Sequence, residues 1–294
     1  LSNLLIEELD LSQINFNGNT LTLQCKQLNK IVGSETFNGS LFLLPKDCRL
    51  TEFTLEGISN IQGDFQCIDY FYVKEFVMPF IRVAGDMTIA LNSGSVNTAA
   101  EIEFPKLQEI GGTLTLGTNR NANNITFPLL KKILGSCSVT TYNLKNDIEF
   151  TNLESIGTDG ADAQIKFEIE ATNILCPKLK TINGKFDIAT SSFMFDMEVD
   201  KVSYPNVESI SENLSITCPY SDFGSNGILS IDFSGLKSVK GISISGQGDV
   251  SDFSSFKYLF ENNVLTGESQ WSVKECGYNP TFQEMKDGKY KLAE

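Results

Sequence analysis

Histidine is absent from all 294 residues of this sequence. Catalysis by Ser-His-Asp or Cys-His groups and metal sites with imidazole ligands are therefore excluded. P-loop and dinucleotide-binding motifs are also missing, since SGQGDVSD at 245–252 is only a fragment of the latter. We therefore expect no enzyme, no catalytic residue, no cofactor and no metal site. Glycosidic chemistry needs only two carboxylates, so a carbohydrate-active enzyme using paired carboxylates stays open.

Long hydrophobic runs are missing as well. No apolar stretch approaches the roughly 18 residues that cross a membrane as a helix. The chain also does not begin with the charged segment, apolar segment and small residues that form a signal peptide. We therefore expect no transmembrane segment. The chain begins abruptly at Leu1, which we interpret as a processed or truncated end, and an extracellular location therefore stays open.

Basic residues are few and scattered. Lys and Arg total 23 against 37 Asp and Glu, which gives a net charge of −14. Phosphate binding needs clustered Lys and Arg, so nucleic acid and anionic membrane surfaces are disfavoured as partners. Acidity of this kind keeps an extended protein soluble. Carboxylates in TDGADA at 158–163 and GDVSD at 248–252 leave calcium dependence open, although neither segment has a full calcium-binding loop.

The seven cysteines have an odd count and no CxxC spacing. A disulfide framework of the kind found in short secreted domains is therefore not expected. Instead, Cys25, Cys67, Cys137 and Cys176 stand where a recurring phrase has apolar residues, and we predict that they are reduced and interior.

That recurring phrase is the main positive signal. In its clearest copy, FPKLQEIGGTLTL from Phe104, an aromatic residue and Pro precede two aliphatic anchors, Gly and a two-residue alternation. The first anchors of nine copies lie 23 to 30 residues apart, and repetition at this period indicates a solenoid. The anchor pairs are Leu28/Ile31, Ile58/Ile61, Ile81/Val83, Leu107/Ile110, Leu130/Ile133, Leu153/Ile156, Leu179/Ile182, Val207/Ile210 and Leu236/Val239.

Each copy can be interpreted as one coil. The alternation in residues 113–116 predicts a short strand with one buried face, and stacking of equivalent strands gives parallel sheets and interior ladders. We expect the pairs Leu114 and Leu116, Phe186 and Ile188, and Leu214 and Ile216 to be buried in equivalent strands. The Gly residues at 63, 85, 112, 135, 184 and 241 are expected at corners, where a side chain would clash or φ is positive.

We therefore predict a single mainly β solenoid domain over residues 1–294. Residues 1–20 are expected to cap the N-terminal end, 21–246 to form about nine coils and 247–294 to cap the C-terminal end. Leu4, Leu5 and Leu9 have helical spacing in the first cap. The second cap is expected to contain a short helix from Asn279-Pro280 or Thr281 to Gly288. Its apolar bulk is expected from Phe253, Phe256, Tyr258, Leu259, Phe260, Trp271 and Val273.

Two surfaces remain for binding. The outward strand positions, such as Thr113 and Thr115, are small and polar and favour no ligand. The loops at 69–76, 191–199 and 218–227 are richer in aromatic residues, which are enriched at binding hot spots. We therefore predict a ligand site formed by Tyr70, Tyr72, Phe193, Phe195, Tyr220 and Phe223.

The phrases FPKLQEIGGTLTL, FPLLKKILGS and CPKLKTINGKFDI resemble the repeat of the receptor L domain and of leucine-rich bacterial surface proteins of the BspA-like group. The resemblance covers about residues 20–246 and implies a right-handed β-helix of leucine-rich-repeat type. The Cys-rich flanks of the receptor version are missing. The tail from Trp271 is similar to C-terminal segments of leucine-rich surface lipoproteins of gut bacteria, which implies a bacterial, lipid-anchored protein at the cell surface.

The functional hypothesis is a monomeric, non-enzymatic recognition or adhesion module that binds a protein or glycan. Two alternatives stay open: the carbohydrate-active β-helix enzyme, and a purely structural envelope protein. Carboxylates converging in one groove beside basic residues would favour the enzyme, and a featureless polar surface would favour the structural protein.

Overall fold

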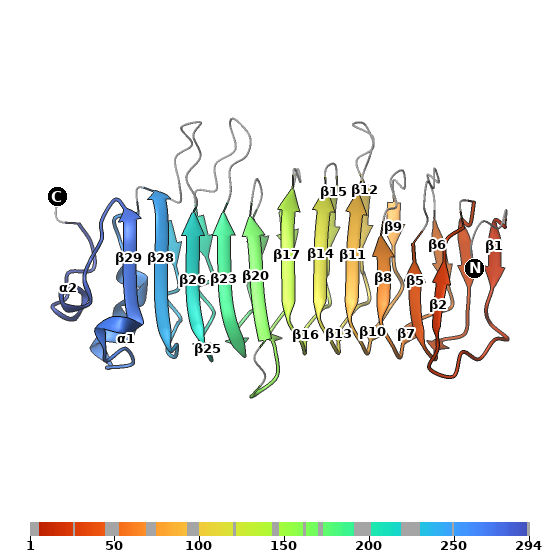
Figure 1. Cartoon of the computed structure of the whole chain (residues 1–294), viewed down its shortest axis with the longest axis horizontal. Helices are drawn as coiled ribbons and strands as arrows, with labels where there is room; N and C mark the ends of the chain where they lie inside the picture. The colour runs from red at the N-terminus through yellow and green to blue at the C-terminus, as the bar shows by residue number, and fades with distance from the viewer. Residues whose placement is uncertain are drawn as a thin grey trace.

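The chain winds into an elongated β-solenoid built from parallel sheets, as the sequence predicts (Figure 1). This computed structural model describes residues 6–25, 27–44, 53–68, 75–92, 100–119, 122–142, 147–160, 163–169, 173–190, 201–218, 230–248 and 250–292. Every pairing between its strands is parallel within these ranges. The strands predicted from the two-residue alternation therefore pair in parallel from one coil to the next.

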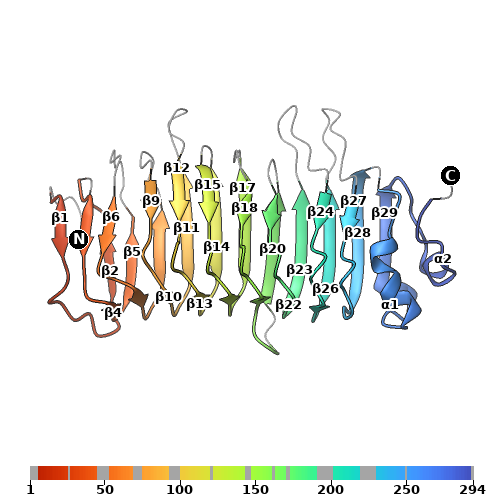
Figure 2. The same cartoon turned by 180° about the vertical axis from the view of Figure 1, so that it is seen from behind.

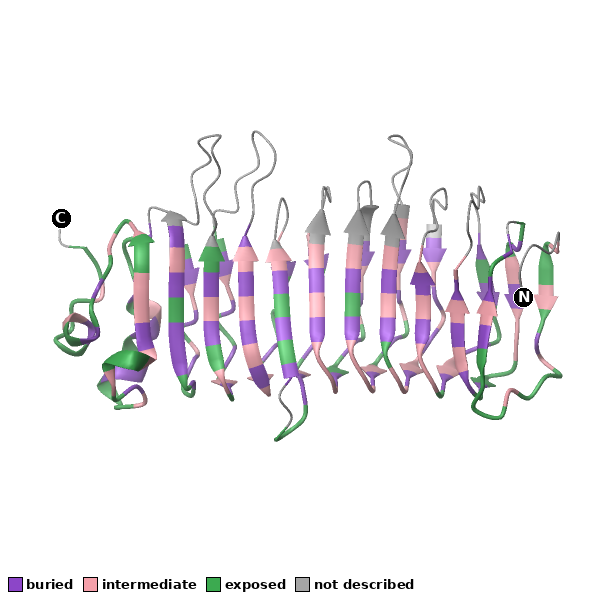
Figure 3. Ribbon diagram, in the orientation of Figure 1, coloured by how far each residue is buried: buried purple, intermediate pink, exposed green. Residues whose placement is uncertain are grey.

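The longest sheet, here called the front sheet, has eleven strands in the described chain. They are β2 (Thr20–Leu23), β5 (Ser40–Leu43), β8 (Phe65–Ile68), β11 (Met87–Asn92), β14 (Leu114–Asn119), β17 (Cys137–Tyr142), β20 (Ala163–Ile169), β23 (Gly184–Thr190), β26 (Asn213–Cys218), β28 (Gly241–Gly248) and β29 (Trp271–Cys276). Buried residues alternate with partly exposed or exposed ones along most of these strands, from β2 to β26, whereas in the last strand β29 only Trp271 is buried (Figure 3).

The lower sheet lies along one edge of the front sheet and has eight short strands in the described chain (Figures 1 and 2). They are β4 (Thr36–Phe37), β7 (Asn60–Ile61), β10 (Arg82–Val83), β13 (Glu109–Ile110), β16 (Lys132–Ile133), β19 (Ser155–Ile156), β22 (Thr181–Ile182) and β25 (Ser209–Ile210). The solenoid has about seven turns, which is the number of steps from β4 to β25.

The rear strands form three separate sheets (Figure 2). The first contains β1 (Glu8–Asp10), β3 (Lys30–Val32) and β6 (Thr54–Glu56). The second contains β9 (Glu75–Val77), β12 (Ala100–Glu103), β15 (Ala122–Thr126), β18 (Ile148–Glu149) and β21 (Ile174–Leu175). The third contains β24 (Lys201–Ser203) and β27 (Ser230–Asp232).

The core consists of ladders of equivalent side chains. All six residues expected in the front-sheet ladder are buried, and Phe186 pairs with Leu214 as Ile188 pairs with Ile216. The rings of Phe104, Phe127 and Phe150 stack at centroid distances of 4.8 and 4.9 Å, close to the spacing of neighbouring strands. In-register stacking therefore places like residues in contact along the axis.

One of the nine expected repeat copies lies in the wrong sheet, and a second has the correct register at Val83, which pairs with Ile61 and Ile110, but a displaced first anchor. Ile31 lies in the rear strand β3, and the lower-sheet partner of Ile61 is Phe37. In the copy anchored on Ile81, the buried residue is Phe80, while Ile81 is partly exposed. Ile31 follows Leu28 at the same spacing as in most of the other copies, so the sequence pattern does not distinguish a rear strand from a strand of the lower sheet.

The corner glycines are required by close approach. A β-carbon on Gly85 would lie 2.1 Å from the Asp64 carboxylate, and one on Gly112 would lie 2.2 Å from that of Asp86. Neither glycine has a positive φ. The first of the two expected reasons, a steric clash, is therefore the correct one here.

The C-terminal cap covers the last coil. It contains η1 (Ser254–Phe256), α1 (Lys257–Glu261), η2 (Glu268–Gln270) and α2 (Phe282–Lys286). Trp271 is buried, and its indole N–H donates to the Pro280 carbonyl at 2.9 Å. Thr281 and Glu284 form a capping box at the start of α2, as predicted. The expectation for Tyr258 is wrong, because its side chain is 42% exposed.

The N-terminal prediction requires a similar correction. Leu9 lies in strand β1, which pairs with β3, and does not lie in a helix. Leu4 and Leu5 are outside the described residues. Residues 6–25 thus begin the solenoid itself, because β1 and β2 already join the rear and front sheets.

Candidate functional site

The six aromatic residues of the predicted ligand site lie outside the described residues. This applies to Tyr70, Tyr72, Phe193, Phe195, Tyr220 and Phe223. The strands on either side of these loops are described, however, and they define where the loops begin and end.

All three predicted binding loops leave the same edge of the front sheet, here called the loop edge. Loop 69–76 follows β8 and its last two residues belong to β9, where Phe76 is buried; loop 191–199 follows β23 and loop 218–227 begins at the end of β26. These strands are parallel members of one sheet, so their carboxyl ends point to one edge (Figure 1). Thr190, the last residue of β23, is buried there, and its hydroxyl has no hydrogen-bond partner in the described part of the chain.

From β8 to β17 the outward face of the front sheet carries small and polar residues along one row, as predicted, while Phe42 of β5 continues that row at its N-terminal end. Gln66, Thr88, Thr115 and Ser138 occupy one register row across β8, β11, β14 and β17. Ion pairs lie farther along, between Lys166 and Glu168 and between Lys185 and Asp187. Groups of this size bury little apolar surface, so the face itself offers a partner little desolvation energy.

The charge on Glu168 is stabilised locally. Hydrogen bonding from Lys166 lowers the pKa of this carboxyl group, and a bond of 2.8 Å from the Thr140 hydroxyl acts in the same direction. Partial burial opposes both effects. The arrangement keeps a carboxylate ionised, so it does not provide the raised pKa that a general acid needs.

The predicted cysteine chemistry is confirmed. Cys25, Cys67, Cys137 and Cys176 are all buried and reduced. Burial raises the pKa of the Cys67, Cys137 and Cys176 thiols above their usual range. A thiol held in its protonated form is a poor nucleophile and metal ligand, so these residues act as interior packing groups.

A first hollow, of about 120 Å³, lies where the rear strands separate between β21 and β24. Cys176 stands here in the position that Phe104, Phe127 and Phe150 hold in earlier coils. The next coil has Tyr204, whose buried hydroxyl donates to the Ile174 carbonyl at 3.0 Å. Tyr204 thereby supplies one hydrogen bond across a break in the strand ladder, here called the rear seam.

A second hollow, of about 320 Å³, lies beside the end strand β4 of the lower sheet. It is lined by Leu11, Ser12, Gln13, Ile14, Asn15, Ser34, Thr36, Phe37 and Asn38. We call this hollow the β4 slot. Sequence reasoning missed it; the available signal was Ile14, an aliphatic residue within the polar stretch SQINFNGN where the repeat phrase is absent.

Metal and membrane features are not evident in the described part of the chain. Within those ranges, no three His, Cys, Asp or Glu side chains are grouped to hold a metal ion. Asp252 instead accepts a hydrogen bond from the Ser254 backbone at 2.7 Å. No helix of the described residues is long and apolar enough to span a membrane.

Comparison with known proteins gives no match: no family model, no curated protein and no solved structure is similar to this chain. The resemblance to receptor L domains and leucine-rich surface proteins therefore stays a hypothesis based on the repeat phrase.

Proposed function

We propose that this chain is a non-enzymatic recognition or adhesion module that binds a protein or glycan at a cell surface. The observation that carries the proposal is the loop edge. Parallel strands of one sheet bring three aromatic-rich connections to one edge of a rigid scaffold. Loops held in this way by a regular framework are where binding residues concentrate in proteins.

The cell-surface assignment and the lipid anchor rest on the resemblance of the phrase and of the tail from Trp271 to leucine-rich surface lipoproteins. The monomeric state belongs to the same proposal, since the C-terminal cap covers the last coil and allows that end of the solenoid to finish without a partner. Fractionation of the source cell, followed by detergent extraction of the membrane fraction, tests this part: a lipid-anchored surface protein should be released by detergent and should be cleaved by protease added to intact cells.

The binding proposal is tested by screening the full chain against extracellular matrix proteins and glycans, with and without calcium. Once a partner is found, Tyr70→Ser, Tyr72→Ser, Phe193→Ser and Tyr220→Ser are compared with Thr88→Ala and Thr115→Ala. We expect the loop changes to weaken binding at least tenfold, because buried aromatic anchors dominate interface energies. The strand-face changes should leave affinity within about twofold.

The opposite pattern, with affinity lost only on changing Thr88 or Thr115, would place the site on the front face instead. Turnover of a polysaccharide in the same screen would favour the carbohydrate-active enzyme. A screen with no binding and no turnover would favour the structural envelope protein. Circular dichroism and thermal unfolding of each variant separate lost binding from lost folding.

A further inference from the structure

The β4 slot exists because the first coil stands away from the second over a short stretch. On one side of the slot, the Leu11 N–H donates to the Val32 carbonyl at 2.7 Å. On the other side, the Gly18 N–H donates to the Asn38 carbonyl at 2.6 Å. Between these two bonds, the described residues of the two coils are joined by one hydrogen bond, which the Ser34 hydroxyl donates to the Ser12 carbonyl.

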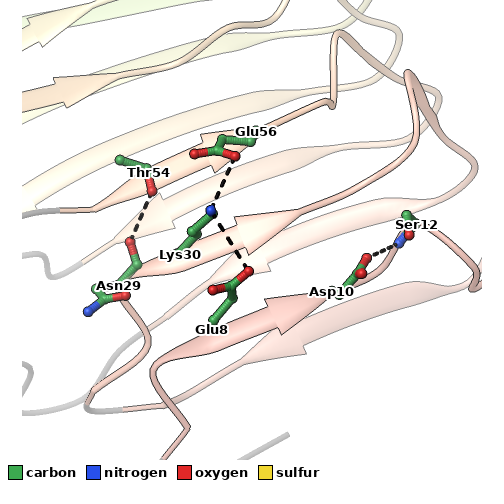
Figure 4. A network of polar contacts seen from close by, with 7 residues as sticks. All are labelled: Glu8, Asp10, Ser12, Asn29, Lys30, Thr54 and Glu56. Atoms are coloured by element: carbon green, nitrogen blue, oxygen red, sulfur yellow. Dashed lines mark hydrogen bonds and ion pairs between the residues drawn. The ribbon is translucent and has the colours of Figure 1, made fainter.

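The ends of the loop that walls the slot are fixed. At its start, the Ser12 N–H donates to the Asp10 carboxylate at 2.8 Å (Figure 4). Hydrogen bonds from the Ser12 hydroxyl and N–H lower the pKa of Asp10, which keeps this acceptor ionised. Near its end, Asn17 has a φ of +46°, and Gly18, with a φ of +81°, is bonded to the second coil. The loop is therefore anchored at both ends, and the Phe16 ring packs against Phe37 at a centroid distance of 4.7 Å. No described backbone hydrogen bond joins residues 12–17 to β4.

The wall opposite the loop is an open sheet edge. The Asn60 and Gln62 N–H groups donate to the Glu35 and Phe37 carbonyls, so these two residues face β7. In a parallel ladder, alternate residues direct their N–H and C=O groups to opposite sides. Thr36 therefore directs both groups toward the slot, and neither has a partner among the described residues. Unpaired groups of this kind form a template for another strand.

The side chains of the slot are uncharged. Gln13, Asn15 and Asn38 bring amide groups, while Leu11 and Phe37 are buried beside them. Ile14 is 51% exposed, which is unusual for an aliphatic residue of this chain. Without a charged group in its lining, the slot does not favour an ion, whereas a neutral segment with alternating apolar side chains matches it.

We propose that the β4 slot binds an extended, uncharged peptide segment of a partner protein, which adds a strand to the free edge of β4. Strand addition obtains its affinity from main-chain hydrogen bonds and its specificity from side-chain pockets. Ladder strands of this sheet are only two residues long, so a segment of about three residues can complete the pairing. Strand β4, which lines the slot, lies on the edge opposite the loop edge (Figure 2). The inference is independent of the proposed function.

The test uses the full chain and a blocked peptide, acetyl-Ser-Val-Thr-Val-Ser-amide, followed by amide NMR and hydrogen exchange. We expect the peptide to shift and protect the Thr36 and Asn38 amides. Thr36→Pro removes the N–H that faces the slot and leaves the β4–β7 bonds intact, because edge strands tolerate proline. It should weaken binding at least tenfold, whereas Thr36→Val should keep the dissociation constant within about twofold.

Ile14→Ser removes the exposed apolar contact without touching the sheet, and should weaken binding about threefold or more. The matched probe acetyl-Ser-Pro-Thr-Pro-Ser-amide, which lacks two N–H groups, should not protect Thr36. If Thr36→Pro unfolds the chain, the Ile14 variant and the proline peptide decide the question.

Three results with the peptide probe or without any probe would overturn the inference. They are an unchanged Thr36 amide at saturating probe, equal binding by the Thr36→Pro and Thr36→Val variants, and protection of Thr36 by residues 12–17 closing onto β4 without any probe. Protection by methyl glucoside but not by the peptide would also reject a peptide ligand. Because the loop-edge variants are not used, failure here leaves the proposed function standing.

Discussion

At the scale of single residues, the corners of this solenoid leave no room for a β-carbon. The Asp64 carboxylate accepts a hydrogen bond from the Asp86 N–H of the next coil at 2.8 Å, and Asp86 repeats this contact with Thr113 at 2.7 Å. The acceptor oxygens lie where a side chain on Gly85 or Gly112 would begin. The hydrogen bonds between the coils therefore require glycine at these corners.

We predict that Gly85→Ala lowers the free energy of unfolding by about 1–3 kcal/mol, because an inserted methyl group forces a tightly packed corner apart. Urea denaturation measures the change. Gly117→Ala is the matched control, since a β-carbon there would meet nothing within 4 Å, and it should stay within about 0.5 kcal/mol of the unmodified protein.

The double variant Asp64→Ala/Gly85→Ala should lose less than the sum of its single changes, with a coupling of about 0.5–3 kcal/mol. Strict additivity would show that the Asp64 oxygen is not the group that Gly85 accommodates.

At the scale of elements, the rear seam is one of two breaks between the rear sheets in the described chain, and here a side chain joins one coil to the next in place of a strand ladder. β21 and β24 belong to different sheets, and the Tyr204 hydroxyl bonds the Ile174 carbonyl between them. The neighbouring coils on this side, from β9 to β21, are joined by continuous backbone pairing. We expect the seam to open at a lower free energy than those coils.

We predict that Tyr204→Phe destabilises the protein by about 1–3 kcal/mol, because the ring stays while the buried Ile174 carbonyl loses its donor. Hydrogen exchange should accelerate at residues 173–175 and 201–204 more than at 125–126. Exchange that accelerates equally in both regions would contradict a local role. Tyr290→Phe serves as the control for removing a hydroxyl from a partly buried ring outside the seam.

At the scale of the whole molecule, buried thiols connect stability to alkaline pH. Burial raises the pKa of Cys67, Cys137 and Cys176, and it raises the pKa of Tyr204 in the same way. Their protonated forms contribute stability that is fully present below the unfolded thiol pKa of about 8.5. This contribution is lost as pH rises from there toward the folded values.

We therefore predict that the urea concentration at the midpoint of unfolding decreases as the pH is raised from 8 to 10.5. Cys137→Ala should reduce this fall, although it lowers stability at every pH by leaving a small cavity. Cys276→Ala, at a partly exposed position, should leave the fall unchanged. A midpoint that does not vary over this range would contradict the linkage.

Much of the fold could be predicted because its information is local and repeated. Leu114 and Ile188 are buried as expected, since a two-residue alternation after Gly specifies one inward face at each coil. Phe37 was missed because its coil lacks the phrase, and only its pairing with Ile61 reveals its position. The β4 slot exists because the backbone of residues 12–17 does not pair with β4. This depends on tertiary packing, which the sequence pattern does not indicate.

The stacking of equivalent residues at a spacing of 23 makes the length of this molecule adjustable. Phe104, Leu107, Ile110, Leu114 and Leu116 are followed 23 positions later by Phe127, Leu130, Ile133, Cys137 and Val139. Excising residues 104–126 would therefore bring Phe127 next to Glu103 and present the same kinds of contact to the preceding coil. Such a protein would be a shorter rod with both ends unchanged, so evolution can set the reach of this scaffold by whole units without redesigning its cross-section.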